Sequence, residues 1–226
     1  MKNGATGKRK MLGALLGVLL IWFFSGVAFA NTLVTGVDIE SVSSEYYTTD
    51  WDLRAIHVVD GSGFNGVTQT HDVTSPGGNS WQTITQSGTG NIKFDLGGVF
   101  VLDELHIWNL NFYSPYNGRG ANQVVINTSL DLSSWVGMGT YSFQQASGIA
   151  NDPGFTLDAS NWGSARYVEF DILNSFGGSD NAGHVGLSEV RFFAKDSSLP
   201  VPEPTTMLLL GLGLVGLAGV RRKFQK

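Results

Sequence analysis

Short segments of alternating polarity, separated by glycine-rich turns, constrain the fold of this chain more than any other feature. Apolar residues recur at every second position in segments 92–96, 124–126 and 168–172, which is the period of a strand with one buried face. Turn-forming pairs such as Asp60-Gly61 stand between these segments. No window of a dozen residues carries a helical stripe. The sequence therefore predicts an all-β fold, either an antiparallel sandwich or a barrel.

Continuous apolar runs predict the more deeply placed strands. Runs 99–102 and 105–110 are expected to be covered on both sides, and the run 185–194 is expected to close the domain. The stretch 31–52 is interpreted as an opening strand and a loop. Because the segments share one pattern and show no repeat, residues 31–200 are expected to form a single domain.

The first 30 residues have the pattern of an export signal. Three basic residues at 8–10 precede an apolar run at 11–24, and Ala28-Phe29-Ala30 supplies the small residues that flank a cleavage site. We therefore expect residues 1–30 to be a signal peptide for export through the Sec pathway. The alternative is an uncleaved anchor helix, although the run is shorter than the ~20 residues of a membrane span.

The last 26 residues have the pattern of a second sorting signal. Pro202, Glu203 and Pro204 precede an apolar run at 207–220, which ends in basic residues at 221–223. As a helix with ~1.5 Å rise per residue, the run is short for a hydrocarbon core of ~30 Å. The basic end should stay cytoplasmic by the positive-inside rule. Residues 201–226 therefore predict a short transmembrane helix that holds the protein in the inner membrane before processing.

This tail resembles the Pro-Glu-Pro C-terminal (PEP-CTERM) sorting signal of exopolysaccharide-producing Gram-negative bacteria. The resemblance implies that an exosortase processes the tail and releases or re-anchors the protein at the cell surface. It also predicts a location at the cell surface or in the extracellular matrix, with only transient membrane anchoring.

Charge and cysteine content exclude several classes of protein. Between Asn31 and Pro200 the chain has six basic and eighteen acidic residues, a net charge of −12. Such a domain would repel phosphate backbones, so nucleic acid is not expected as a partner. The chain contains no cysteine, which excludes disulfides and cysteine-ligated metal sites.

The order of several short segments between Ala55 and Ala194 resembles the discoidin, or coagulation-factor C-type, galactose-binding-like domain. The resemblance implies an eight-stranded jelly-roll sandwich with binding loops at one end. Three features depart from it: the cysteine pair is missing, Leu132 replaces a glycine after Asp131, and the loop 62–80 is long. The matching segments are 58–61, 81–83, 92–97, 105–109, 129–135, 165–168 and 185–192.

The same resemblance implies a structural calcium between the Asp-Gly loop and a glutamate on the last strand, here Asp60 and Glu189. Calcium takes six to eight oxygen ligands, so loop carbonyls and the side chain of Thr70 or Asp72 would have to complete the shell. The alternative is that Asp60 shapes a turn, while Glu189 pairs with Arg54 or Arg166.

A mixed aromatic and amide segment is the candidate ligand site. Flat aromatic faces suit the C–H faces of pyranose rings, while amides and a guanidinium suit their hydroxyls. The alternative is that Trp108 and Phe112 belong to the core and that the asparagines satisfy loop backbone. The candidate residues are Trp108, Asn111, Tyr113, Tyr116 and Arg119.

The glycine-rich loop 176–184 is expected to add Asp180 and His184 to the same site. A histidine–aspartate pair also suggests acid–base chemistry, but a loop histidine without a nucleophile is more typical of hydrogen bonding. No GxSxG, HExxH or P-loop pattern is present, and no pair of carboxylates is singled out for glycoside hydrolysis.

These observations predict an exported, non-catalytic protein that binds or organises extracellular polysaccharide through loops of a galactose-binding-like sandwich. Two alternatives stay open. One is a structural or adhesion protein of the matrix that recognises proteins or itself, and the other is a hydrolase of that polysaccharide.

Overall fold

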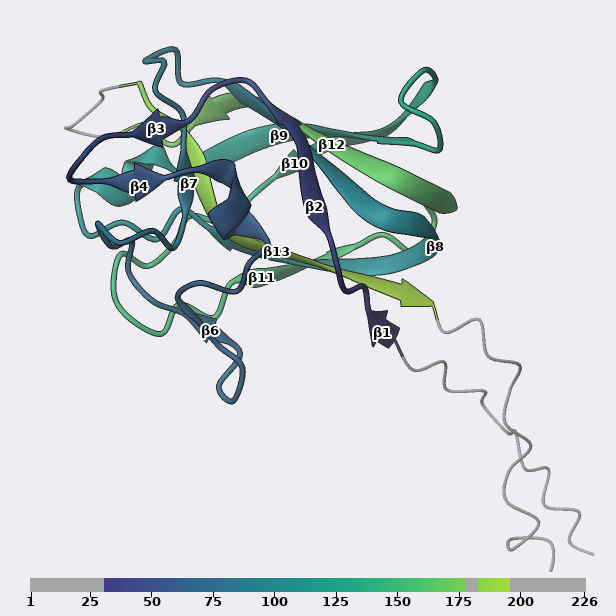
Figure 1. Ribbon diagram of the computed structural model, residues 1–226, viewed down its shortest axis with the longest axis horizontal. Coiled ribbons are helices and arrows are strands. Elements are labelled where there is room, and N and C mark those ends of the chain that lie inside the picture. Colours follow the sequence, from purple (N-terminus) through teal and green to yellow (C-terminus); the bar gives the residue numbers. More distant parts are fainter. Residues whose placement is uncertain (1–30, 178–182, 196–226) are drawn as a thin grey trace, which may run out of the picture.

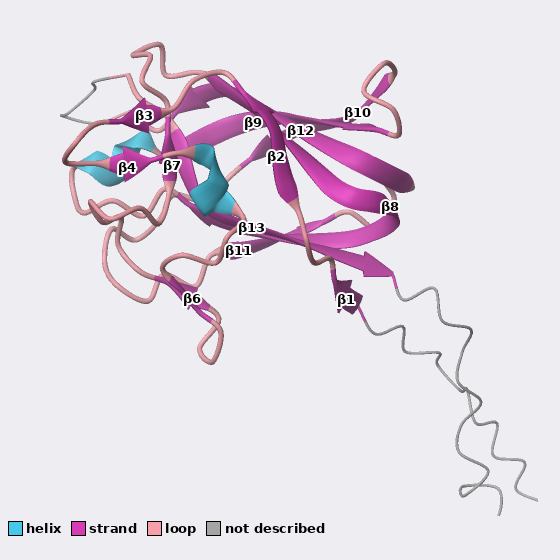
Figure 2. Ribbon diagram, in the orientation of Figure 1, coloured by secondary structure: helices cyan, strands magenta, loops and turns pink. Residues whose placement is uncertain are grey.

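The computed structural model describes residues 31–177 and 183–195 as an antiparallel β-sandwich of two layers (Figures 1 and 2). The predicted signal peptide (1–30) and sorting tail (201–226) lie outside the described residues. The all-β prediction is confirmed, since the described helical structure consists of two short 3-10 helices, η1 (Ala55–Val58) and η2 (Tyr116–Arg119). In the part of the chain that the structure describes, no helix has the length and apolarity needed to span a membrane.

One layer has the strand order β2–β8–β12–β9–β10, and the other has the order β11–β8–β13–β1, with β7 paired to β13. Two short hairpins, β3–β4 and β5–β6, lie outside these layers. The first layer contains β2 (Asp38–Val42), β9 (Ala121–Ser129), β10 (Trp135–Ser142) and β12 (Ser164–Ser175). The second contains β1 (Asn31–Leu33), β7 (Trp81–Gln82), β11 (Phe155–Asp158) and β13 (Gly186–Lys195). The hairpin strands are β3 (Tyr46–Tyr47), β4 (Asp52–Leu53), β5 (Phe64–Asn65) and β6 (Thr70–His71).

The long strand β8 (Gly90–Asn109) belongs to both layers. Its first half pairs with β2 and β12, whereas its second half pairs with β11 and β13. Gly97, between the two halves, has φ of +76°, a conformation that glycine adopts without steric penalty. The two separate runs predicted at 99–102 and 105–110 are therefore parts of one strand.

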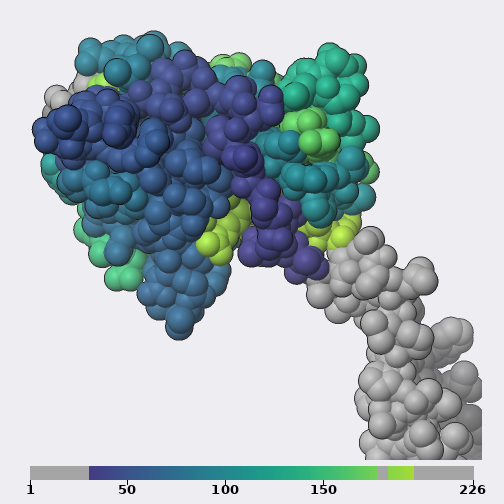
Figure 3. All heavy atoms as spheres, viewed as in Figure 1, coloured from purple at the N-terminus to yellow at the C-terminus, as the bar shows by residue number. Residues whose placement is uncertain are grey.

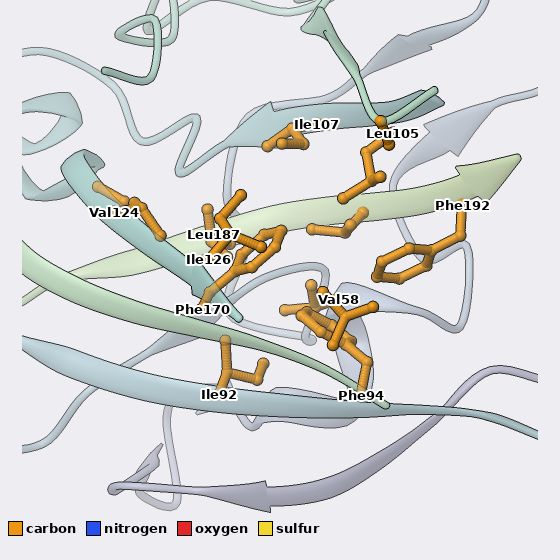
Figure 4. Close-up of a cluster of buried hydrophobic side chains, with 14 of the residues drawn as sticks. Val58, Ile92, Phe94, Leu105, Ile107, Val124, Ile126, Phe170, Leu187 and Phe192 are labelled. Atoms are coloured by element: carbon orange, nitrogen blue, oxygen red, sulfur yellow. The ribbon is translucent and has the colours of Figure 1, made fainter. Parts of the chain in front are cut away.

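Apolar side chains from both layers meet between the sheets (Figure 4). Phe94 of β8 lies 5.3 Å from Phe170 of β12 and 5.2 Å from Phe192 of β13, both edge-to-face. Such aromatic pairs add to the stabilisation from area burial. The alternating segments thus point their apolar residues inward as predicted, and β13 is the predicted closing strand.

One burial prediction is wrong. Val99 and Val101 are 60% and 42% exposed, so the run 99–102 is not covered on both faces. Phe100 and Leu102 pack against the core, so the alternate residues Val99 and Val101 point to the outer face of β8, where they are exposed. The run 105–110 is covered as predicted, because its outer face lies beneath the segment that carries β5 and β6.

Candidate functional site

A pocket of about 270 Å³ opens at the end of the sandwich that carries β3, β4, β7 and η2. In Figures 1 and 2 these elements gather at the opposite end of the molecule from β1. The described residues that line it come from four separate parts of the chain: Tyr46, Trp51, Leu53, Gln82, Phe112, Tyr113, Tyr116, Arg119 and His184.

A small apolar cluster supports this pocket. Leu53, Leu110 and Phe112 are buried, and Tyr46, Trp51 and Tyr116 pack against them. Leu110 and Phe112 follow directly after β8, so burial of these two side chains turns the chain inward before η2 begins. The pocket therefore has a rigid apolar support, which limits the entropy lost when a ligand is held.

Two tyrosines and one arginine form the exposed wall. Tyr113 is 50% exposed, and its ring lies 5.2 Å from that of Tyr116 at an interplanar angle of 89°. The Arg119 guanidinium lies 4.6 Å from the centre of the Tyr116 ring, and its Nη1 donates to Gln82 Oε1 at 3.2 Å. The wall combines aromatic faces with a guanidinium that stacking and a hydrogen bond hold in place.

His184 forms part of the inner wall. Its Nδ1 donates to the carbonyl oxygen of Thr83 at 2.7 Å, which fixes the ring orientation. The edge of its ring meets the ring of Tyr46 at 5.8 Å. The structure thus brings together four predicted ligand residues, Tyr113, Tyr116, Arg119 and His184, while Asp180 lies outside the described residues.

Trp108 does not belong to this pocket, and its predicted contact with ligand is wrong. Its side chain is 1% exposed and lies on the outer face of β8. It stacks on His106 at 4.1 Å and meets the edge of Phe64 at 4.9 Å. Because the hairpin β5–β6 carries Phe64 over this face, Trp108 packs as in a core, which was the alternative interpretation.

Asn111 is also absent from the pocket lining, so its predicted ligand contact is wrong too. The residue is fully buried and its side chain satisfies loop backbone. Its Nδ2 donates to the carbonyl oxygens of Ile149 at 2.8 Å and Asp72 at 3.2 Å, and its Oδ1 accepts from Gly148 N at 2.9 Å. Asn111 therefore fastens two loops together.

Tyr46, Trp51 and Gln82 line the pocket but were not predicted to do so. The segment 45–51 is rich in aromatic residues, which was the available signal. The sequence does not show that this segment folds beside η2, more than 60 residues away along the chain. Gln82 lies within a segment that resembles discoidin domains, yet its type alone does not distinguish a binding residue from a strand residue.

Asp60 shapes the turn after η1. Its Oδ1 accepts from Ser62 N at 2.8 Å, and its Oδ2 lies 2.9 Å from His57 Nδ1. Burial opposes ionisation of Asp60, but the hydrogen bonds from Ser62 and His57 outweigh it and hold the pKa of this carboxyl below its usual value. Asp60 therefore shapes the turn, as the alternative interpretation predicted.

Glu189 pairs with Arg191, not with Arg54 or Arg166 as the alternative predicted. Arg191 Nε donates to Glu189 Oε1 at 3.0 Å, whereas the other two arginines bind Asp52 and Asp95. Glu189 is 1% exposed, and its Oε2 is buried without a hydrogen-bond partner among the described residues. Burial raises the pKa of Glu189 to about 7.

Asp72, the third residue predicted to bind metal, is exposed. The described residues contain no group of three or more histidine or acidic side chains that could hold a metal ion. Asp60 and Glu189 are nevertheless close enough for the Asp60 carboxylate to disfavour ionisation of Glu189.

Comparison with known proteins adds two findings to this geometry. Residues 200–223 match the model of the PEP-CTERM protein-sorting motif. The chain carries a PEP-CTERM sorting signal. This signal indicates an exported protein that is sorted to the cell envelope and processed by an exosortase, as the tail predicted. No curated protein matches the PEP-CTERM chain.

The sandwich of this PEP-CTERM protein is similar to solved domains of the CBM32 type, which are discoidin-like or galactose-binding-like. One is a fragment of a Bacteroides thetaiotaomicron protein, with 15% identity, TM-score 0.54, and coverage of 79% of this chain and 99% of that one. Another is CpGH89CBM32-5 from Clostridium perfringens, solved with GalNAc-β-1,3-galactose, with 16% identity, TM-score 0.52, and coverage of 73% and 100%. The chain spans only 15% of the length of a family 89 glycoside hydrolase from Clostridium perfringens, with TM-score 0.47 and 18% identity.

Proposed function

We propose that this chain is an exported, non-catalytic protein that binds or organises extracellular polysaccharide. The pocket beside η2 holds the sugar. The signal peptide at 1–30 directs export through the Sec pathway, and the sorting tail directs the protein to the cell surface or the extracellular matrix. The observation that carries the proposal is the pocket itself, which joins aromatic faces and fixed hydrogen-bonding groups at the loop end of a β-sandwich.

The chemistry of the pocket supports a sugar ligand. Tyr113 and Tyr116 offer aromatic surface for the C–H faces of a pyranose ring. Arg119 and Gln82 add donors and an acceptor for its hydroxyls. Because Arg119 is held by Gln82 and by the Tyr116 ring, little conformational entropy is lost on binding.

The position of the chain ends supports surface display. Strands β1 and β13 pair with Asn31 opposite Lys195, so the described chain begins and ends at one place. Figures 1 and 3 place this point at the opposite end of the molecule from the dark-blue elements around the pocket. A tail that follows Lys195 would therefore hold the domain with its pocket directed outward.

The described pocket lining also supports a binding role over hydrolysis. Glycoside hydrolysis uses two carboxylates about 5 to 9 Å apart. Neither aspartate nor glutamate occurs among the lining residues that the structure describes. We expect no new reducing ends when the protein is incubated with polysaccharide, and release of such ends would favour the hydrolase alternative.

A structural calcium at Asp60 and Glu189 is part of the same proposal. The buried Oε2 of Glu189 has no donor in the described structure, and the neighbouring Asp60 carboxylate adds a second negative charge. A hard cation bound between them would give Oε2 a partner beside the Glu189–Arg191 pair, with loop carbonyls completing its shell. Its effect would be to fasten the Asp60 loop to β13, since the site lies outside the pocket.

Affinity electrophoresis in gels that contain the exopolysaccharide of the producing bacterium tests the proposal. Wild-type protein should be retarded, and the triple variant Tyr113→Ala, Tyr116→Ala, Arg119→Ala should migrate as in a gel without polysaccharide. Tyr47→Ala is the matched control, because Tyr47 is 62% exposed but does not line the pocket. Retardation of the triple variant equal to that of wild type would contradict the proposed site.

A further inference from the structure

The open edges of the two sheets differ in length and charge. Strand β1 has three residues, and β11 has four and ends in Asp158. Strand β2 has five residues and carries Asp38 and Glu40. Short strands and charged side chains are the usual protection of an edge against pairing with another chain. These three edges are therefore protected.

Strand β10 is a different kind of edge. It has eight residues, Trp135–Ser142, and contains no charged residue and no proline. Among the described strands it pairs with β9 alone, so the backbone groups on its other side pair with no described strand, although the Met138 carbonyl oxygen accepts from the Tyr141 hydroxyl at 3.1 Å. In the described structure its protection is local: a register shift between Gly137 and Gly139 and the Tyr141 hydroxyl on the Met138 carbonyl. The shift bends the strand but leaves residues on each side of it.

The lack of charge extends well beyond the strand. No acidic or basic residue occurs from Leu132 to Asn151, although the domain as a whole has a net charge of −12. Val136 on the strand is 60% exposed, and Thr140 and Ser142 are also exposed. Two copies of so acidic a domain repel each other over most of their surfaces, but not along this stretch.

We propose that β10 is an interface for a second copy of this chain. Two identical edge strands related by a two-fold axis pair antiparallel, so one edge is complementary to itself. The pairing would join the β2–β8–β12–β9–β10 layers of two molecules into one continuous sheet. A second copy is favoured over an unrelated partner, because β10 carries no charged group that a different protein would have to match. The same uncharged strand can therefore form both halves of the interface.

An interface made mainly by one strand from each copy is small, so the dimer should be reversible and depend on concentration. It would also place two polysaccharide pockets on one particle, and two linked sites bind a repeating polymer more tightly than one. The proposal goes beyond sugar binding, and dimerisation does not require that the pocket bind sugar.

Sedimentation velocity of the full-length chain in detergent tests this interface. We expect wild type to shift from monomer to dimer as concentration rises, and the double variant Val136→Glu, Thr140→Glu to weaken association at least tenfold. The matched control is Thr156→Glu on the exposed edge β11, which should dimerise as wild type does. All of these proteins keep the tail, so association that survives in the double variant would overturn the proposal, as would a monomeric wild type.

Single cysteines provide a second test that does not depend on a charged variant folding. Because the natural chain has no cysteine, an introduced one has no other partner. Oxidation should link two copies through at least one of Val136→Cys, Thr140→Cys and Ser142→Cys, whichever lies nearest the two-fold axis. Thr156→Cys should not link. Equal linking of all four, or of none, would overturn the proposal.

Discussion

Two clusters of described residues combine an arginine with aromatic rings, but they differ in how far their largest rings are exposed. The open cluster, Tyr113, Tyr116 and Arg119, lines the pocket and includes a tyrosine that is 50% exposed. In the covered cluster, Phe64, Trp108 and Arg191, the guanidinium lies 3.4 Å from the centre of the Phe64 ring, and Trp108 is 1% exposed. The two clusters have similar composition. They differ because the hairpin β5–β6 covers Trp108 in one cluster, whereas Tyr113 in the other stays exposed.

Residue types therefore indicate that an aromatic cluster forms, but the loop that covers it decides whether the cluster can bind a ligand or only packs inside the fold. In the open cluster, a removed ring should weaken ligand binding and leave the fold intact. In the covered cluster, a removed ring leaves a cavity and should destabilise the fold.

Trp108→Ala should have the largest effect on stability. Replacement of a fully buried aromatic side chain by alanine typically lowers the free energy of unfolding by about 3 to 5 kcal/mol. The measurement is denaturant unfolding followed by circular dichroism. Tyr113→Ala in the open cluster is the control and should cost less than about 1 kcal/mol. Equal losses for the two variants would break the distinction between the clusters.

The second prediction concerns pH and Glu189, which binds the covered cluster through Arg191. Burial raises the pKa of Glu189 from 4.5 to about 7 in the folded protein. Between these values the unfolded chain releases a proton that the folded chain keeps, so stability falls as pH rises, by up to ~3 kcal/mol. Stability curves of wild type and Glu189→Gln from pH 4 to 8 should therefore differ, with the fall missing in the variant.

The effect of calcium on thermal stability tests whether Glu189 also binds a metal ion. A cation that binds the ionised Glu189 favours the folded state, so the melting temperature at pH 8 should rise with calcium and fall with a chelator. At pH 4.5, where Glu189 is protonated, calcium should have little effect. If neither calcium nor chelator changes the melting temperature at pH 8, the calcium proposal is contradicted. The prediction for the pH dependence of stability through Glu189 would not be affected by that result.

Removal of the Tyr116 ring should have an intermediate effect, which should appear in ligand affinity and not in stability. Tyr116→Ala removes the surface on which Arg119 stacks as well as a face for the sugar, so affinity for exopolysaccharide oligosaccharides should fall about tenfold or more. Isothermal titration calorimetry measures this, with Tyr47→Ala as control. Weaker binding in both variants to the same degree would show that the open cluster is not the site.

The smallest effect is expected at Leu132, outside both clusters. Leu132 has φ of +65°, a conformation that is unfavourable for leucine. Its backbone N donates to Ser129 Oγ at 3.0 Å, which holds the turn. Leu132→Gly should raise the free energy of unfolding by about 0.5 to 1 kcal/mol, measured by thermal unfolding. A less stable variant would show that the backbone at Leu132 is not strained.

The sequence predicted the strands and the all-β class well, because alternation and glycine turns are local signals, but it did not show that one strand, β8, runs through both layers. It also placed Tyr113, Tyr116, Arg119 and His184 at one site. It did not separate Trp108 from them, because Trp108 is covered by Phe64, which lies more than 40 residues earlier in the long loop 62–80. Nor did it add Trp51 to the pocket. Burial and pocket lining depend on contacts between distant segments, and a single sequence carries no direct signal of these.

The most direct test of the account is hydrogen–deuterium exchange of the full-length chain with and without exopolysaccharide oligosaccharides. Ligand should slow the exchange of backbone amides around the open cluster, at 112–119, and in the hairpin β3–β4. Exchange in the hairpin β5–β6, above the covered cluster, should not change. Protection confined to β5–β6, or none at either place while binding is shown by calorimetry, would contradict the account.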